Sequence, residues 1–176
     1  LLLTTASRHR ENAVFVSRDH GATWDPLGLP FPDLSLQSAL VTPGEERLWV
    51  TGNTLEEWKP VVLTFTSQTN KWEPLPLDLS AWDRFTLLEY SPQTGTILAG
   101  ARTQGGQATL LTSSDTLESL ERAGDVGEGT ITDVATLGDL RFVTTREETG
   151  APHLWRSEGR SPFREVEGPR GCLERG

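Results

Sequence analysis

The eight residues from 17 to 24 constrain the fold of this chain more than any other stretch. They follow the pattern Ser-x-Asp-x-Gly-x-Thr-Trp, whose defined positions are Ser17, Asp19, Gly21, Thr23 and Trp24. Short Ser and Asp side chains accept hydrogen bonds from nearby backbone N–H groups, and glycine adopts a positive φ without a Cβ penalty. The tryptophan offers a large apolar face as the chain returns. The pattern predicts a tight turn between two strands, in which Asp19 is structural rather than catalytic.

Three partial copies of this turn follow along the chain. Ser113 and Asp115 belong to the clearest copy, at residues 113–120, and weaker copies occupy residues 66–72 and 156–163. Intervals of 48, 48 and 43 residues separate the large apolar residues of the four copies, which are Trp24, Trp72, Leu120 and Phe163. Repeats of about 40–50 residues are typical of β-propeller blades. The spacing therefore predicts one blade for each turn.

The first turn resembles the Asp-box, or BNR, repeat. This repeat is shared by sialidases, sortilin-type receptor domains, xyloglucan-degrading glycosidases and photosystem assembly factors. The resemblance implies a β-propeller whose Asp-box turns lie on the face opposite the usual ligand face, so Asp19 and Asp115 are excluded from a candidate active site. It does not select a function, because these families do unrelated things on one fold. It also implies an extracytoplasmic location, periplasmic or secreted.

The repeat predicts an all-β fold with about four four-stranded blades. The blades are expected near residues 1–30, 31–78, 79–125 and 126–167, and a C-terminal tail at 168–176. Alternating apolar residues and turn residues predict fifteen strands, with the innermost strand of the first blade missing. We therefore expect an arc of a larger propeller; the alternative is a ring closed by an incomplete blade. An arc leaves an apolar face and a strand edge uncovered, so self-association or a companion chain is expected.

Charge and cysteine content argue against several classes of partner. The formal net charge is −9 and the sequence pI is about 4.8, which disfavours nucleic acids and anionic membranes. No apolar run reaches the roughly 18 residues of a membrane-spanning helix, so we expect no membrane insertion. Cys172 is the single cysteine, and no Cys/His cluster has zinc-site spacing, so we expect no disulfide, metal or other cofactor. The chain contains no Met, which indicates a processed chain or a fragment.

No catalytic set can be named from the sequence. A sialidase would need an arginine triad, an Arg-Ile-Pro motif and a Tyr–Glu nucleophile pair. The only tyrosine, Tyr90, follows Glu89 directly. Neighbours on a strand point to opposite faces, so these two side chains are not expected to form that pair. Enzyme function is therefore not favoured.

A ligand face is predicted from the loops that join the second and third strands of each blade. These loops are expected on one face of the propeller, at residues 6–12, 53–59, 102–107 and 146–150. Three of them carry an arginine, Arg8, Arg102 or Arg146, and the other carries Trp58. Arginine and tryptophan are frequent binding hot spots, so the face could hold a carboxylate or an acidic peptide. Trp82 is expected in a loop near the same face. The alternative is solvated loop charge, because glutamates accompany the arginines.

The sequence thus favours a non-catalytic recognition or scaffold propeller that binds a protein or peptide, with carbohydrate as another ligand class. A sialidase-like glycoside hydrolase, with its catalytic residues outside this chain, is the first alternative. A structural or sensor domain of a larger envelope protein is the second.

Overall fold

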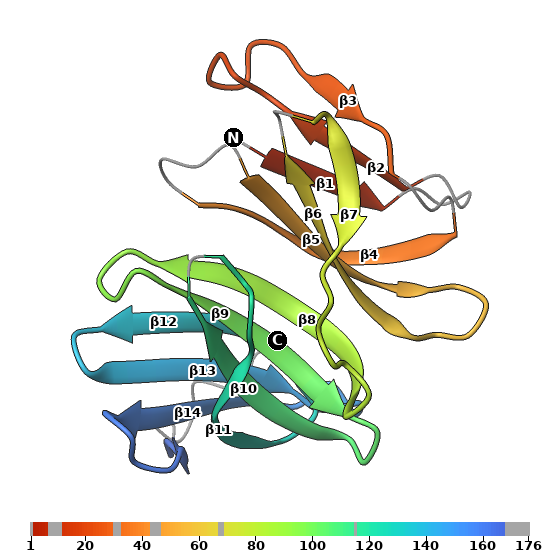
Figure 1. The fold of residues 1–176 in the computed structure, drawn as a ribbon. Coiled ribbons are helices and arrows are strands. Elements are labelled where there is room, and N and C mark those ends of the chain that lie inside the picture. Colours follow the sequence, from red (N-terminus) through yellow and green to blue (C-terminus); the bar gives the residue numbers. More distant parts are fainter. Residues whose placement is uncertain are drawn as a thin grey trace.

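The computed structural model describes most of the chain as β-strands joined by short turns (Figure 1). The described residues are 2–6, 12–29, 33–42, 47–66, 69–114 and 116–167, with the backbone alone at 2–6 and 12. The predicted all-β class is confirmed: the described residues form fifteen strands in four antiparallel sheets. Within the same residues there is no helix long and apolar enough to cross a membrane. Three residues named above lie outside the described residues, namely Arg8, Asp115 and Cys172.

The strands pair in chain order within each sheet. The first sheet has three strands, β1 (Leu2–Ala6), β2 (Asn12–Val16) and β3 (Asp25–Leu27). The second contains β4 (Leu34–Val41), β5 (Arg47–Thr54), β6 (Pro60–Thr66) and β7 (Lys71–Pro74). The third contains β8 (Trp82–Ser91), β9 (Thr96–Thr103), β10 (Gln107–Ser113) and β11 (Glu121–Glu128). The fourth contains β12 (Thr130–Leu137), β13 (Leu140–Arg146), β14 (Pro152–Glu158) and β15 (Arg164–Glu165).

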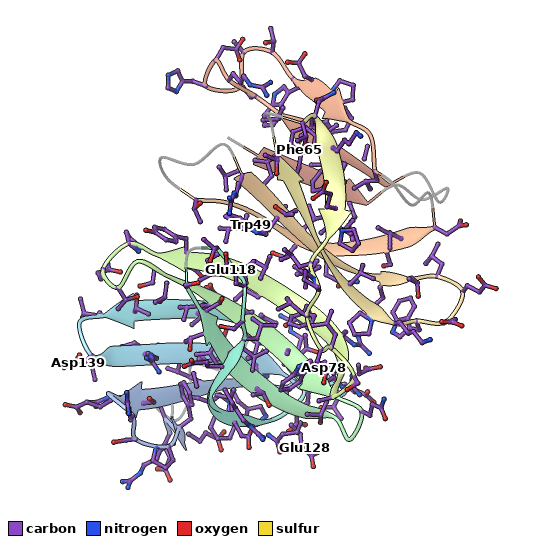
Figure 2. The ribbon with its side chains drawn as sticks, in the orientation of Figure 1. Trp49, Phe65, Asp78, Glu118, Glu128 and Asp139 are labelled. Carbon is purple, nitrogen blue, oxygen red and sulfur yellow. The ribbon has the colours of Figure 1, made fainter. Side chains whose placement is uncertain are left out.

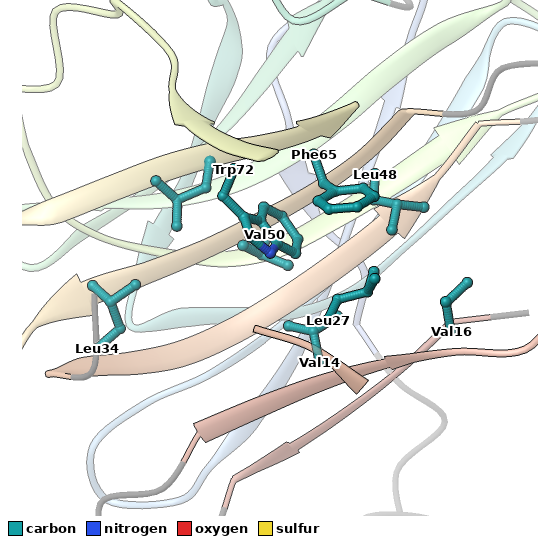
Figure 3. Packing of buried hydrophobic residues seen from close by; sticks show 9 residues of the cluster. Val14, Val16, Leu27, Leu34, Leu48, Val50, Phe65 and Trp72 are labelled. Atoms are coloured by element: carbon teal, nitrogen blue, oxygen red, sulfur yellow. The ribbon is translucent and has the colours of Figure 1, made fainter. Parts of the chain in front are cut away.

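Each sheet packs face to face on the next one along the chain. Strand β5 shows why, because successive side chains point to opposite faces of a strand and both of its faces are apolar. Leu48 and Val50 contact the first sheet, in a cluster that also holds Phe65 and Trp72 (Figure 3). Trp49 points the other way, into a second cluster shared with the third sheet. A third cluster joins the third and fourth sheets.

Strands β4, β8 and β12 are the innermost strands of the second, third and fourth sheets. Strand β8 packs against both β4 and β12. The second strand of each sheet also packs against the innermost strand of the next, as β5 does on β8 and β9 on β12. Strand β1 packs on β4 in the same way, so the first sheet lacks its innermost strand, as predicted. On the far face of the fourth sheet, Leu137 and Leu154 are exposed. The sheets therefore form an arc with an open apolar side.

Two predicted boundaries are wrong. Simple alternation predicts the last strand of the third blade at residues 119–123, whereas β11 runs from Glu121 to Glu128. Trp82, expected in a loop, is the first residue of β8. The register is irregular between residues 82 and 84 of β8, and where β11 pairs with residues 107–111 of β10. A bulge adds an unpaired residue and breaks the period-two pattern, so simple alternation ends β11 too early and starts β8 too late.

The turn at residues 17–24 is closed by side-chain hydrogen bonds. The backbone N–H of Gly21 donates to Ser17 Oγ at 2.7 Å, and Gly21 has φ of 90°. Asp19 accepts from the Thr23 backbone N–H at 2.8 Å and from Thr23 Oγ1 at 2.6 Å. These bonds, with a further one from Ser17, lower the pKa of Asp19 to about 2. The Trp24 indole lies beside Gly21, and Ser113, from the partial copy, is buried at the end of β10.

Replacing Asp19 with alanine is expected to lower the thermal midpoint at neutral pH. The folded-state pKa of about 2 lies below the ordinary value of 3.8, so the carboxylate stabilises the fold above pH 3.8. This stabilisation is lost as the pH falls from 3.8 towards 2. Thermal melts at several pH values should therefore show the largest gap between wild type and variant above pH 4, and convergence near pH 2.

The matched control is Asp139→Ala, in the exposed turn between β12 and β13. Its melting difference should be small, because no side-chain hydrogen bond of Asp139 closes that turn among the described residues. A gap for Asp19→Ala that persists unchanged at pH 2 would show that its carboxylate charge does not stabilise the turn.

Candidate functional site

One end of the sheets collects the loops that the sequence placed on a ligand face. These are the β5–β6, β9–β10 and β13–β14 loops, together with the segments that lead into β8 and β12. The turns at 17–24 and 138–139 lie at the opposite end, because antiparallel strands alternate their connections. In Figure 2, Asp78 and Glu128 mark the loop end and Asp139 marks the other. Two pockets open among these loops.

The first pocket lies between the second and third sheets and has a volume of about 570 Å³. Trp58 and Trp82 line it together with Leu79, and apolar surface predominates. Trp58 is 42% exposed, whereas Trp82 and Leu79 are partly buried and pack on the second cluster. The other lining residues are Glu57, Lys59, Pro60, Ser80, Asp83 and Gln104. The volume falls in the range of small-ligand and side-chain pockets, about 300–1,000 Å³.

Asn53 holds the two rims of the first pocket together. It is the penultimate residue of β5, and its side chain is fully buried. Its Nδ2 donates to the Trp58 carbonyl at 3.0 Å and to the Asp83 carbonyl at 2.8 Å. Its Oδ1 has no hydrogen-bond partner among the described residues. The Asn53 amide therefore holds the β5–β6 loop, which carries Trp58 and is called the tryptophan loop below, against β8 of the next sheet.

Trp58 adopts a backbone conformation that bulky side chains rarely take. Its φ is 53°, in the left-handed region. Hydrogen bonds on either side hold it there: the Thr54 N–H donates to the Lys59 carbonyl at 2.9 Å, and the Lys59 N–H donates to Thr54 Oγ1 at 3.1 Å. Such strain costs of order 1–3 kcal/mol and is concentrated at functional sites. Here it presents a large indole to the solvent side of the pocket.

The second pocket lies between the third and fourth sheets and has a volume of about 300 Å³. Arg102 is 17% exposed at its wall and donates to Glu148 at 2.9 Å. Its Nε has no partner among the described residues. Glu128 and Glu147 also line the pocket. Arg102, a predicted ligand-binding residue, thus forms an ion pair with a glutamate of the neighbouring sheet.

A histidine behind the second pocket ties Glu147 to the edge of the fourth sheet. His153 Nδ1 lies 2.6 Å from Glu165 Oε1, and Nε2 lies 3.0 Å from Glu147 Oε1. The hydrogen bond to Glu165 and the two glutamate charges raise the pKa of His153. These two contacts place His153 between the start of the β13–β14 loop and β15.

The remaining predicted residues are less closely grouped. Arg146 ends β13 and is exposed, and its carbonyl lies against Gly129. Glu89 and Tyr90 point to opposite sides of β8, as predicted: Tyr90 packs on the second cluster, whereas burial and the charge of Asp133 raise the pKa of Glu89. Among the described residues, no group of three or more His, Cys, Asp and Glu side chains could hold a metal ion.

Sequence reasoning missed Asn53 and Glu148 as site residues. Both fall inside loops that were singled out for other residues. A polar amide at the end of an otherwise apolar strand was a usable signal for Asn53, because buried polar groups are normally hydrogen-bonded. Arg102 and Glu148 lie on different sheets and are 46 residues apart in the sequence, so no local pattern indicates that they pair.

Comparison with known proteins identifies the architecture. No protein-family model matches the sequence, and no curated protein matches it. Among solved structures, YCF48 bound to D1 peptide is 18% identical, with a TM-score of 0.57 over 87% of this chain and 48% of that one. The Hadza microbial sialidase Hz136 is 16% identical, with a TM-score of 0.61 over 92% and 41%. GH43B of the Bacteroides ovatus xyloglucan locus is 14% identical, with a TM-score of 0.58 over 96% and 38%.

The chain is an incomplete β-propeller. It spans less than half the length of each of these three structures. At such low identities the likeness concerns the fold alone. Activity, ligands and partners therefore have to be argued from the pockets of this chain.

Proposed function

We propose that this propeller arc is a non-catalytic recognition module that binds a peptide segment of another protein at its loop face. The observation that carries the proposal is the first pocket, in which Trp58 and Trp82 form apolar walls on two different sheets. Aromatic side chains in partly buried pockets are typical anchors of protein and peptide interfaces. The fold likeness to YCF48, solved with a bound D1 peptide, adds support.

The geometry of the loop end favours recognition over chemistry. Arg102 is paired with Glu148, and Lys59 lies 2.6 Å from Glu57, so these two basic side chains are engaged in ion pairs. A catalytic set needs a nucleophile, a base and an orienting group within hydrogen-bond reach. The apolar surface of the first pocket instead suits binding.

Trp58→Asn is the decisive variant. Asparagine tolerates the left-handed conformation that residue 58 adopts, so the loop should keep its shape while the indole is lost. Peptides selected from a random library on the wild-type chain should bind the variant at least tenfold more weakly by calorimetry, a loss of about 1.4 kcal/mol. Leu137→Asn, at the opposite end, is the matched control and should bind normally. Equal affinity for wild type and Trp58→Asn would place recognition elsewhere.

A second candidate function comes from the fold likeness to a sialidase and a GH43 glycoside hydrolase. In that case the catalytic residues would lie in blades other than these four, and this chain would contribute one wall of the cleft. Hydrolysis of fluorogenic glycosides by a protein that contains the complete propeller would support this candidate over the recognition module.

A further inference from the structure

We propose that the two pockets form one composite site for an extended peptide that carries a large apolar side chain and, two residues away, a lysine or arginine. The apolar side chain would occupy the first pocket and the cation would lie over the second. This inference rests on the proposed function and specifies its ligand.

The two pockets share a wall. The β9–β10 loop separates them, with Gln104 lining the first pocket and Gly105 and Gly106 lining the second. The two glycines carry no side chains, so the ridge between the pockets is low. Gly106 has φ of 85°, a conformation that its missing Cβ makes accessible. An extended peptide that crosses this ridge would meet the two pockets with residues i and i+2, because alternate side chains of an extended chain point to the same face.

The first pocket supplies the anchor. Its walls come from two sheets, and Asn53 fixes them relative to each other through the Trp58 and Asp83 carbonyls. The strained backbone of Trp58 keeps the indole at the mouth. A pre-formed, partly apolar cavity loses little entropy when a side chain enters it, which is the condition for a binding hot spot.

The charged residues of the second pocket determine which ligand side chain it would bind. The second pocket is lined by one arginine and three glutamates, and Arg102 is paired with Glu148. Glu147 lies 3.0 Å from His153 Nε2, so Glu128 is the acidic lining residue with no ion pair among the described residues. In the first pocket Lys59 is paired with Glu57, and Asp83 is paired with Arg84 at 3.3 Å, so its charges balance. The acidic excess of the second pocket, together with the net charge of −9, favours a cation there over the acidic peptide suggested by the arginines alone.

Three capped hexapeptides test the inference: Gly-Phe-Gly-Lys-Gly-Gly (the Phe-Lys peptide), the same peptide with Glu for Lys, and the same peptide with Ala for Phe. Binding is followed by the indole N–H resonances of the folded chain in titrations. We expect the Phe-Lys peptide to bind at least tenfold more tightly than the other two and to shift Trp58 and Trp82. Salt should weaken it, since exposed charges are screened within about 8 Å at physiological ionic strength.

Two variants separate the pockets. Glu128→Gln combined with Glu147→Gln should reduce the Lys-over-Glu preference to less than threefold while the phenylalanine is still bound. Trp58→Asn should abolish binding of all three peptides, and its unchanged methyl spectrum would show that the fold is intact.

The failures of the two proposals are distinguishable. Equal binding of the Lys and Glu peptides would overturn the composite site but leave peptide recognition standing. Retained affinity for the Phe-Lys peptide in Trp58→Asn would overturn the anchor. If no member of a random peptide library bound while a neutral oligosaccharide shifted both indoles, peptide recognition itself would be overturned.

Discussion

Replacement of Trp49 with alanine is expected to lower the free energy of unfolding by about 3–5 kcal/mol, the usual loss for a large aromatic residue in a core. Trp49 is fully buried, and its cluster includes Phe85 and Leu88 of the third sheet. Figure 2 shows it where the second sheet meets the third. Chemical denaturation followed by circular dichroism measures the change.

The size of this effect follows from the architecture. Each sheet packs mainly on its neighbours in chain order, so stability is close to a sum of sheets and interfaces. Removing the largest side chain of the middle interface should uncouple the first two sheets from the last two and broaden the transition. Leu137→Ala removes an apolar side chain that is 69% exposed and is the control, with an expected change within about 0.5 kcal/mol. A loss below about 1 kcal/mol for Trp49→Ala would mean that the two sheets are not held together by this cluster.

The strands and their repeat could be predicted because both depend on local chemistry. Apolar alternation marks faces, and the turn residues from Ser17 to Trp24 fix where one hairpin ends. The missing innermost strand of the first sheet followed from the same count. The bulges in β8 could not be predicted, since a bulge depends on how two paired strands accommodate their twist. This is why Trp82 was assigned to a loop.

The grouping of loops at one end of the sheets could be predicted from the sequence, whereas the ion pairs at that end could not. The loop order placed Trp58 and Arg102 at one end of the sheets, and the structure puts them in adjacent pockets. The partner of Arg102 is Glu148, supplied by the next sheet, so the charge of that pocket depends on how the sheets pack. The arginines of the loop face suggested a carboxylate ligand, whereas the proposal of a cation rests on the Arg102–Glu148 pair and the two further glutamates of this pocket.

The first pocket is formed by described residues of two adjacent sheets. The proposed anchor therefore lies within this chain, and the peptide titrations can be carried out on it alone.

Asn53→Leu tests the part of the structure on which the proposed anchor depends. Leucine has a similar volume but no donor, so the Trp58 and Asp83 carbonyls would lose their partner in a buried setting. An unsatisfied buried polar group costs roughly 1–3 kcal/mol, so we expect the free energy of unfolding to fall by about 2–5 kcal/mol. The tryptophan loop should also detach from β8, and the Trp58 resonance should broaden at temperatures where the sheets remain folded.

The control for Asn53→Leu is Thr54→Val at the next position. It removes the single hydrogen bond from the Lys59 N–H and should cost about 1 kcal/mol. Peptide affinity separates the two variants further: Asn53→Leu should lose it at concentrations where the chain is still folded, because the two pocket walls are no longer held in register. If Asn53→Leu were as stable as the wild type and bound as tightly, the rims would be held by the sheets themselves, and the buried amide would have no positioning role.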